Sequence, residues 1–118
     1  MAEFFTARVD AQDFEPFPVD PGDIIEGEPT GRVHWLRRDG ATGLATGIFR
    51  SEPVTARYEW SQDETIHVLE GEVRIEYGDG DAVDLGPGDV ASFRKGDRAV
   101  WHIKSPFKEF FVLSGNSE

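Results

Sequence analysis

The 118-residue sequence contains no cysteine, which excludes disulfide bonds and any metal site built on thiolates. It also has no run of 18 apolar residues, the length that a membrane-spanning helix needs. The first residues, MAEFFTARVD, lack the basic region followed by an apolar stretch that marks a secretory signal. We therefore expect a cytoplasmic protein with no membrane partner.

Basic residues are scarce. Twelve lysines and arginines stand against 23 acidic residues, which gives a net charge of -11. A surface with this charge repels phosphate backbones, so we expect no nucleic-acid partner. The charge is uneven, because residues 1–29 hold eight acidic residues and only Arg8 as a base.

Residues 1–29 form an acidic, proline-rich arm. Its prolines limit regular structure there to a short turn or an edge strand. Its four phenylalanines argue against pure disorder, because a free tail seldom carries so many aromatic residues. We expect the arm to lie across the body of the domain, formed by residues 30–118, or across a neighbouring subunit.

After Gly31 the sequence consists of short segments of alternating polarity, separated by turn residues every eight to twelve positions. Val73, Ile75 and Tyr77, for example, share one face of a segment, the period of two expected of a half-buried strand. No stretch of eleven residues has helical spacing. The pattern predicts an all-β, single-domain sandwich or barrel. The segment FKEFFVL at residues 107–113 is apolar on both faces near its end, which predicts a central strand covered on both sides.

Two phrases, HVLEGEV at residues 67–73 and LGPGDVASFRKG at residues 85–96, resemble the cupin superfamily. The resemblance implies a jelly-roll barrel, the double-stranded β-helix. The aromatic pair that stands in place of the superfamily's two motif histidines is most similar to the ureidoglycine-aminohydrolase-like subfamily. Cupins include isomerases, oxygenases, decarboxylases and sugar binders, so the resemblance implies the fold more specifically than the reaction.

The first cupin motif places two histidines and a glutamate ahead of a glycine. Glu64 stands seven positions before Gly71 and fits the glutamate, whereas the two histidine positions fall on Tyr58 and Trp60. In the second motif Gly88 and Gly96 fit, but Arg94 replaces the proline, Ala99 the histidine and Ile103 the asparagine. A single carboxylate does not hold a transition metal that takes three or four nitrogen or oxygen ligands. We therefore expect no metal and no cofactor in the barrel.

Five residues are candidates for binding a ligand: Tyr58, Trp60, Glu64, Trp101 and Arg94. The aromatic residues offer stacking surface and a polar tip, or alternatively only fill the barrel. The carboxyl group of Glu64 would need a cation, a hydrogen-bond donor or a raised pKa if it were buried, and the alternative is an exposed glutamate at a strand start. Arg94 would attract an anion at the mouth, or is an ordinary surface arginine.

The three histidines, His34, His67 and His102, miss the motif positions, and we interpret them as structural or surface residues. The sequence leaves three functions open. The first is binding of a small polar or aromatic metabolite without a transition metal, its reaction and catalytic residues unknown. The second is a metal-dependent C–N hydrolase of the ureidoglycine-aminohydrolase type, and the third a non-catalytic interaction module. The resemblance also implies a homodimer.

Overall fold

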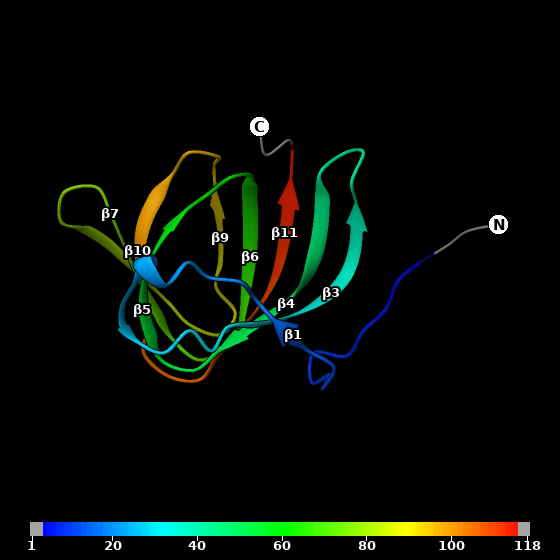
Figure 1. Ribbon diagram of the computed structural model, residues 1–118, viewed down its shortest axis with the longest axis horizontal. Coiled ribbons are helices and arrows are strands. Elements are labelled where there is room, and N and C mark those ends of the chain that lie inside the picture. Colours follow the sequence, from blue (N-terminus) through cyan, green and yellow to red (C-terminus); the bar gives the residue numbers. More distant parts are fainter. Residues whose placement is uncertain (1–3, 116–118) are drawn as a thin grey trace.

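The computed structural model describes residues 4–115, which form two antiparallel β-sheets that face each other (Figure 1). In spatial order the larger sheet consists of β1 (Glu15–Pro16), β3 (Arg32–Asp39), β4 (Leu44–Ser51), β11 (Phe107–Ser114), β6 (Asp63–Glu70) and β9 (Val90–Phe93). The smaller sheet consists of β2 (Ile24–Gly27), β5 (Val54–Glu59), β10 (Arg98–Ile103), β7 (Val73–Tyr77) and β8 (Asp81–Leu85). Within residues 4–115 the one helical turn is the 3-10 turn η1 (Pro21–Asp23). The predicted all-β fold is confirmed.

The alternating polarity of the sequence explains which face of each strand is buried. Along β6 the even-numbered residues Glu64, Ile66 and Val68 are buried, and the intervening side chains are exposed. Because successive side chains of a strand point to opposite faces, the buried set faces the other sheet. Each large aliphatic side chain buried in this way stabilises the fold by about 1.5–3 kcal/mol.

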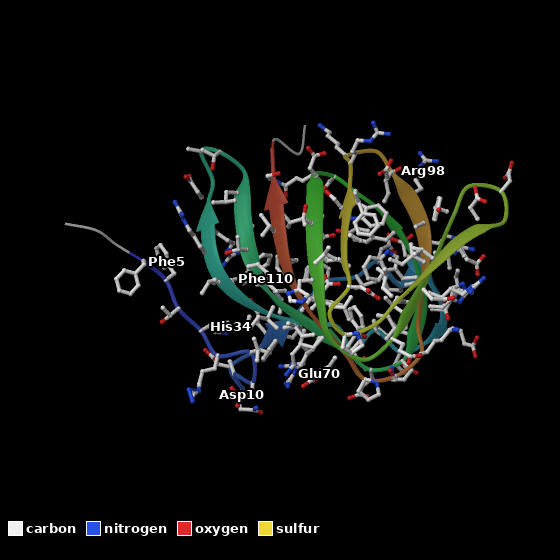
Figure 2. All side chains as sticks on the ribbon, turned by 180° about the vertical axis from the view of Figure 1, so that it is seen from behind. Phe5, Asp10, His34, Glu70, Arg98 and Phe110 are labelled. Carbon is white, nitrogen blue, oxygen red and sulfur yellow. The ribbon has the colours of Figure 1, made fainter. Side chains whose placement is uncertain are left out.

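The core lies between the two sheets. Val33, Ile66 and Phe111 of the larger sheet pack in one buried cluster with residues of the smaller sheet such as Val73 and Ile75. Figure 2 shows Phe5 on the part of the arm that projects away from this core. None of the helices in the described range is long and apolar enough to cross a membrane.

Strand β11 lies between β4 and β6, so the prediction of a central strand at residues 107–113 is confirmed. Both faces of this strand are covered, the outer face only in part. There Phe110 is only half-buried, and its neighbour His67 on β6 is exposed. The arm covers the outer face at β3 and β4, where Phe14 packs against His34 and Arg50, and leaves β11 less well covered.

Candidate ligand-binding site

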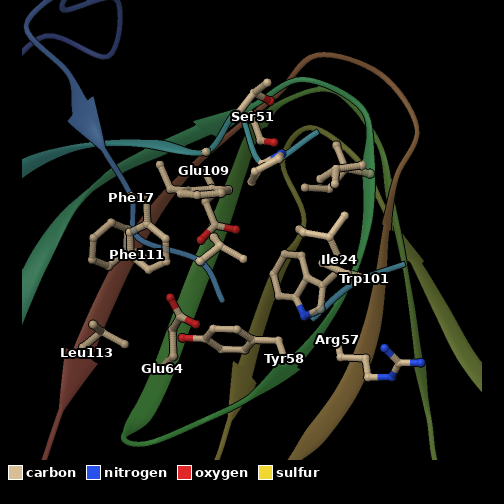
Figure 3. A pocket seen from close by; sticks show the side chains of 18 residues that line it. Phe17, Ile24, Ser51, Arg57, Tyr58, Glu64, Trp101, Glu109, Phe111 and Leu113 are labelled. Atoms are coloured by element: carbon tan, nitrogen blue, oxygen red, sulfur yellow. The ribbon is translucent and has the colours of Figure 1, made fainter. Parts of the chain in front are cut away.

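A pocket of about 120 Å³ lies between the two sheets (Figure 3). Strands β5 and β10 provide one wall through Tyr58, Trp101 and their apolar neighbours. Strands β4, β6 and β11 provide the opposite wall through residues such as Glu64 and Phe111. Most of the lining is aliphatic or aromatic, with a few polar groups among it, which is the usual composition of a small-molecule site.

Two carboxyl groups enter this apolar pocket from neighbouring strands. Glu64 lies on β6 opposite Leu113, and Glu109 lies on β11 opposite Val68. Glu109, Phe111 and Leu113 are two residues apart along β11 and so share its inner face with Glu64. The side chains of both glutamates are buried, with 8% and 3% of their surface exposed. In Figure 3 the two carboxyl groups point toward one another, and the hydroxyl of Tyr58 lies beside the carboxyl group of Glu64.

The carboxyl group of Glu64 is held from behind by Trp60. The indole Nε1 of Trp60 donates a hydrogen bond of 2.8 Å to Oε1 of Glu64. Trp60 itself is 2% exposed and stacks on Phe93 with ring centroids 4.3 Å apart. It therefore orients Glu64 without lining the pocket.

Two buried polar atoms in the pocket residues have no partner in the described part of the chain. They are Oε1 of Glu109, an acceptor, and Nε1 of Trp101, a donor. A buried polar group without a hydrogen bond costs roughly 1–3 kcal/mol. A ligand that supplied the missing partner would recover this free energy.

Burial changes the acidity of all three ionisable groups around the carboxyl pair. It raises the pKa of Glu64 to about 7, an effect that the hydrogen bond from Trp60 partly opposes. It raises the pKa of Glu109 well above its usual value, and the negative charge of Glu64 adds to the rise. The pKa of Tyr58 is also raised, first by burial and then by the two glutamates. Burial therefore favours the protonated form of both carboxyl groups.

The donor set does not fit the transition metal that many cupins hold at these positions. The nitrogen of Trp60 carries a hydrogen that it donates to Glu64, so it offers no lone pair, and Ala99 has no donor atom at all. Among residues 4–115, no three histidine, cysteine, aspartate or glutamate side chains come together as metal ligands. Structural sites and catalytic sites for zinc, by comparison, use three or four such side chains.

Three of the five predicted site residues, Tyr58, Glu64 and Trp101, line the pocket together. Trp60 lies behind the pocket wall. Arg94 lies apart from the others, exposed in the turn after β9, where its backbone nitrogen donates to the carboxylate of Asp97.

None of the three histidines lines the pocket. His67 is exposed on β6, and His102 pairs with Glu76 on the outer face of the smaller sheet. His34 contacts Asp13 and Phe14 of the arm. Sequence reasoning did not identify Glu109. The available signal was its position within FKEFFVL, two residues from Phe107 and two from Phe111, which both face inward.

The arm forms the roof of the pocket. Phe17, Val19 and Ile24 contribute to the lining, and β2 adds an edge strand beside β5. This middle part of the arm therefore lies across the body of the same chain.

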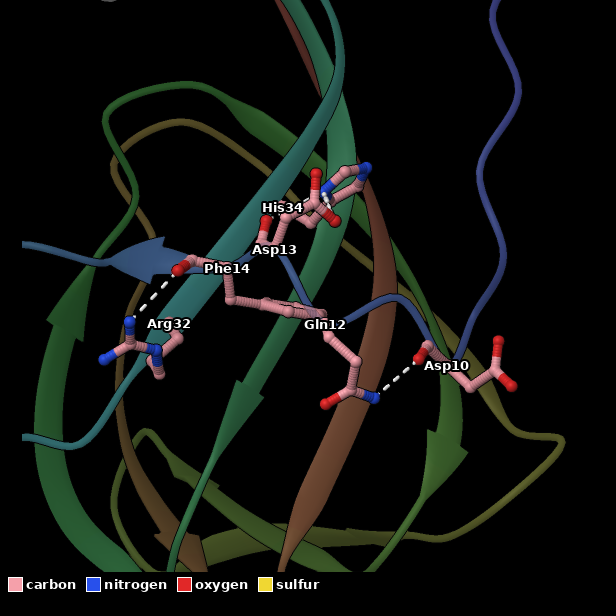
Figure 4. Close-up of polar contacts among 6 residues, drawn as sticks. All are labelled: Asp10, Gln12, Asp13, Phe14, Arg32 and His34. Atoms are coloured by element: carbon pink, nitrogen blue, oxygen red, sulfur yellow. Dashed lines mark hydrogen bonds and ion pairs between the residues drawn. The ribbon is translucent and has the colours of Figure 1, made fainter.

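The arm is held to β3 and β4 by several contacts, of which Figure 4 shows those with β3. Arg32 Nη2 donates a hydrogen bond of 3.0 Å to the carbonyl oxygen of Phe14, and His34 Nδ1 lies 3.0 Å from that of Asp13. The guanidinium of Arg50 lies over the ring of Phe14 at 4.2 Å. These contacts fix the residues that lead directly into the pocket roof.

Residues 39–111 match the family described as the EutQ-like cupin domain. No curated protein matches the chain. The solved structures that resemble it include a putative ethanolamine utilization protein Q from Salmonella typhimurium. That structure has 20% sequence identity and a TM-score of 0.64, with 73% of this chain and 70% of that chain covered.

Two structures of the DUF861 family also resemble the chain. A protein of unknown function from Pseudomonas syringae pv. tomato is 23% identical with a TM-score of 0.82; the match covers 91% of this chain but only 46% of that chain. This chain therefore spans less than half the length of that protein. A protein from Thermotoga maritima is 29% identical with a TM-score of 0.54, covering 56% of this chain and 75% of that one. The expected cupin fold is thus confirmed, and at these identities the shared property is the fold.

Proposed function

The chain belongs to the EutQ-like cupin domain family, and we propose that it binds a small organic molecule between its two sheets without a transition metal. The observation that carries the proposal is the buried acceptor Oε1 of Glu109, which lies without a partner in a pocket-lining residue. A group of this kind is costly unless a bound molecule satisfies it. Tyr58, Glu64 and Trp101 supply the remaining contacts.

The pocket supports binding over simple filling of the barrel. Tyr58 and Trp101 pack edge to face with ring centroids 6.4 Å apart, yet a cavity remains between them and the opposite sheet. Had these aromatic residues only filled the core, their side chains would close the space to native packing density. The cavity favours a small ligand of a few non-hydrogen atoms.

The other two functions have less support. A metal-dependent C–N hydrolase of the ureidoglycine-aminohydrolase type would need nitrogen ligands where this chain has Tyr58, Trp60 and Ala99. An interaction module acting through a free arm would need the arm to be available, whereas the arm lines the pocket. The name of the Salmonella relative refers to ethanolamine utilization, but 20% identity transfers no activity.

A ligand screen tests the proposal. Small molecules of varied charge would be added to the protein while tryptophan fluorescence and thermal unfolding are measured. We expect at least one compound to change both signals, and Glu64→Gln to weaken its binding at least tenfold. The control is Glu70→Gln on the same strand, because Glu70 is exposed and pairs with Lys108 outside the pocket. A screen in which no compound binds, or in which both variants bind equally well, would refute the proposal.

A further inference from the structure

We propose that the ligand is a small primary ammonium ion, held between the carboxyl groups of Glu64 and Glu109 and enclosed by aromatic rings. This inference rests on the proposed function, since it assumes that the pocket binds a ligand, and it adds the ligand's chemical class.

The carboxyl groups of Glu64 and Glu109 are placed so that both can contact one bound ligand. Glu64 lies opposite Leu113, which is four residues from Glu109 on β11, so the strand rise separates the two levels by about 13 Å. The side chains extend toward one another across this separation, and Phe111 occupies the level between them (Figure 3). An ammonium group has several N–H donors on one atom and forms hydrogen bonds of about 2.8 Å to each carboxylate that it contacts.

Among residues 4–115, no cationic side chain that lines the pocket points toward this pair. From β5 the ionisable lining residues are Tyr58 and Arg57, and Arg57 is an exposed residue whose guanidinium points away from the carboxyl groups in Figure 3. Strands β4 and β10 and the arm contribute no ionisable residue to the lining. Two acids in an apolar pocket with no basic partner favour a cation supplied from outside.

Aromatic rings surround the space beside the carboxyl groups. Tyr58 and Trp101 lie on one wall, Phe49 and Phe111 on the other, and Phe17 in the roof. The negative face of such rings attracts organic cations. The unpartnered oxygen of Glu109 can accept a hydrogen bond from a primary ammonium, whereas a quaternary ammonium has no hydrogen to donate. The volume of about 120 Å³ limits the attached chain to a few carbon atoms.

Binding of a cation displaces a proton from the pair. Burial raises the pKa of Glu64 to about 7 and that of Glu109 well above its usual value, so it favours a proton on the free pair. The ammonium keeps its own hydrogens, and the carboxyl proton passes to solvent as the carboxylate forms its hydrogen bonds. The proton and the ligand compete, so affinity rises as the pH is raised through about 7.

Calorimetry with four probes of similar size tests the inference. The probes are n-propylammonium, 1-propanol, propionate and tetramethylammonium, each titrated at pH 7 in two buffers with different ionisation enthalpies. We expect n-propylammonium to bind at least tenfold more tightly than the other three. Its apparent enthalpy should differ between the buffers by the amount that a released proton predicts.

Two variants locate the interaction. Glu109→Gln and Glu64→Gln should each weaken n-propylammonium at least tenfold and reduce proton release, while Glu70→Gln should match the natural chain. Thermal unfolding of each variant checks that it is folded. If one of the two glutamate variants does not fold, the other alone tests the inference. If only the alcohol or the carboxylate binds, or if n-propylammonium binds without proton release, the ammonium inference is wrong and the proposed function stands. If no compound of any charge binds, both are wrong.

Discussion

Trp60, just after β5, and Glu64, near the start of β6, are joined by a hydrogen bond of 2.8 Å from the indole nitrogen to the carboxyl oxygen. Both stand at positions where cupins commonly place metal ligands. In this chain the two side chains satisfy one another, and the second oxygen of Glu64 is left for the pocket. The bond thus orients a buried acid and partly opposes the rise in its pKa that burial causes.

Removing the donor should make Glu64 a weaker acid. The bond from Trp60 lowers the pKa of Glu64 against the effect of burial, so Trp60→Phe should raise that pKa above about 7. An NMR titration of the glutamate carboxyl carbons measures the change. Trp101→Phe is the matched control, because the nitrogen of Trp101 has no acceptor in the described structure and its loss should leave Glu64 unaltered. Equal pKa values in the two variants would contradict the assigned role of the bond.

Stability should depend on pH through Glu64. Its folded pKa of about 7 lies above its ordinary value of 4.5, so its stabilising effect is complete below about pH 4.5 and is lost as the pH rises through 7. Glu64→Gln removes this loss while keeping an oxygen for Trp60. The free energy of unfolding of the variant should match the natural chain near pH 4.5 and exceed it at pH 8 by about 3 kcal/mol.

Urea denaturation at several pH values measures this difference. The exposed Glu70→Gln serves as the control and should show no gain at high pH. Parallel curves for Glu64→Gln and the natural chain would show that Glu64 is not held in a raised-pKa state.

Most of the strands could be predicted from the sequence, because one face of each sheet is buried and the other is not. Residues 63–70 and 73–77 carry this alternation clearly, and both are strands. Short stretches such as Glu15–Pro16 are strands only because they pair with β3, a long-range contact with no local signal.

The site could be predicted only in part. Tyr58, Glu64 and Trp101 follow from the motif positions and from strand parity. Glu109 was hidden in a strongly apolar strand, and its importance comes from its distance in space to Glu64, 45 positions earlier in the chain. The position of Arg94 depends on a turn, whose geometry strand periodicity does not determine.

Gly71 should tolerate alanine poorly. It has a φ of 82°, and an added Cβ would lie 2.2 Å from the carbonyl oxygen of Pro106. Gly80 has a similar φ of 87° but open space around it, so it is the matched control. The left-handed conformation alone should cost Gly80→Ala about 1 kcal/mol. Gly71→Ala should cost about 3 kcal/mol or more, since the backbone must also shift. Chemical denaturation checks both, and equal losses would argue against the close approach to Pro106.

We expect the protein to be a homodimer. The half-buried Phe110 and the exposed His67 leave the outer face of the larger sheet incompletely covered, and a second copy would cover it. Light scattering should give twice the mass of one chain, and Phe110→Lys should give the mass of one. Tyr77→Lys, on the other sheet and also exposed, should remain dimeric. A single-chain mass for the natural protein at micromolar concentration would rule the dimer out.

The arm should stabilise the barrel through the pocket roof. Phe17 packs edge to face against Phe49 with centroids 5.5 Å apart, and its backbone nitrogen donates a 2.9 Å hydrogen bond to the carbonyl of Gly31. Phe17→Ala keeps the backbone bond and removes the ring, so the roof loses apolar contact and β2 loses support beside β5. We expect the free energy of unfolding to fall by about 2 kcal/mol, below the range for a fully buried phenylalanine because Phe17 is half-buried.

Amide hydrogen exchange should accelerate in Ile24–Gly27 and its partner strand Val54–Glu59. Phe5→Ala is the control, because Phe5 is 54% exposed and lies outside the pocket lining, and it should change stability by less than about 0.5 kcal/mol. Equal effects of the two substitutions would show that the arm does not support the pocket of its own chain.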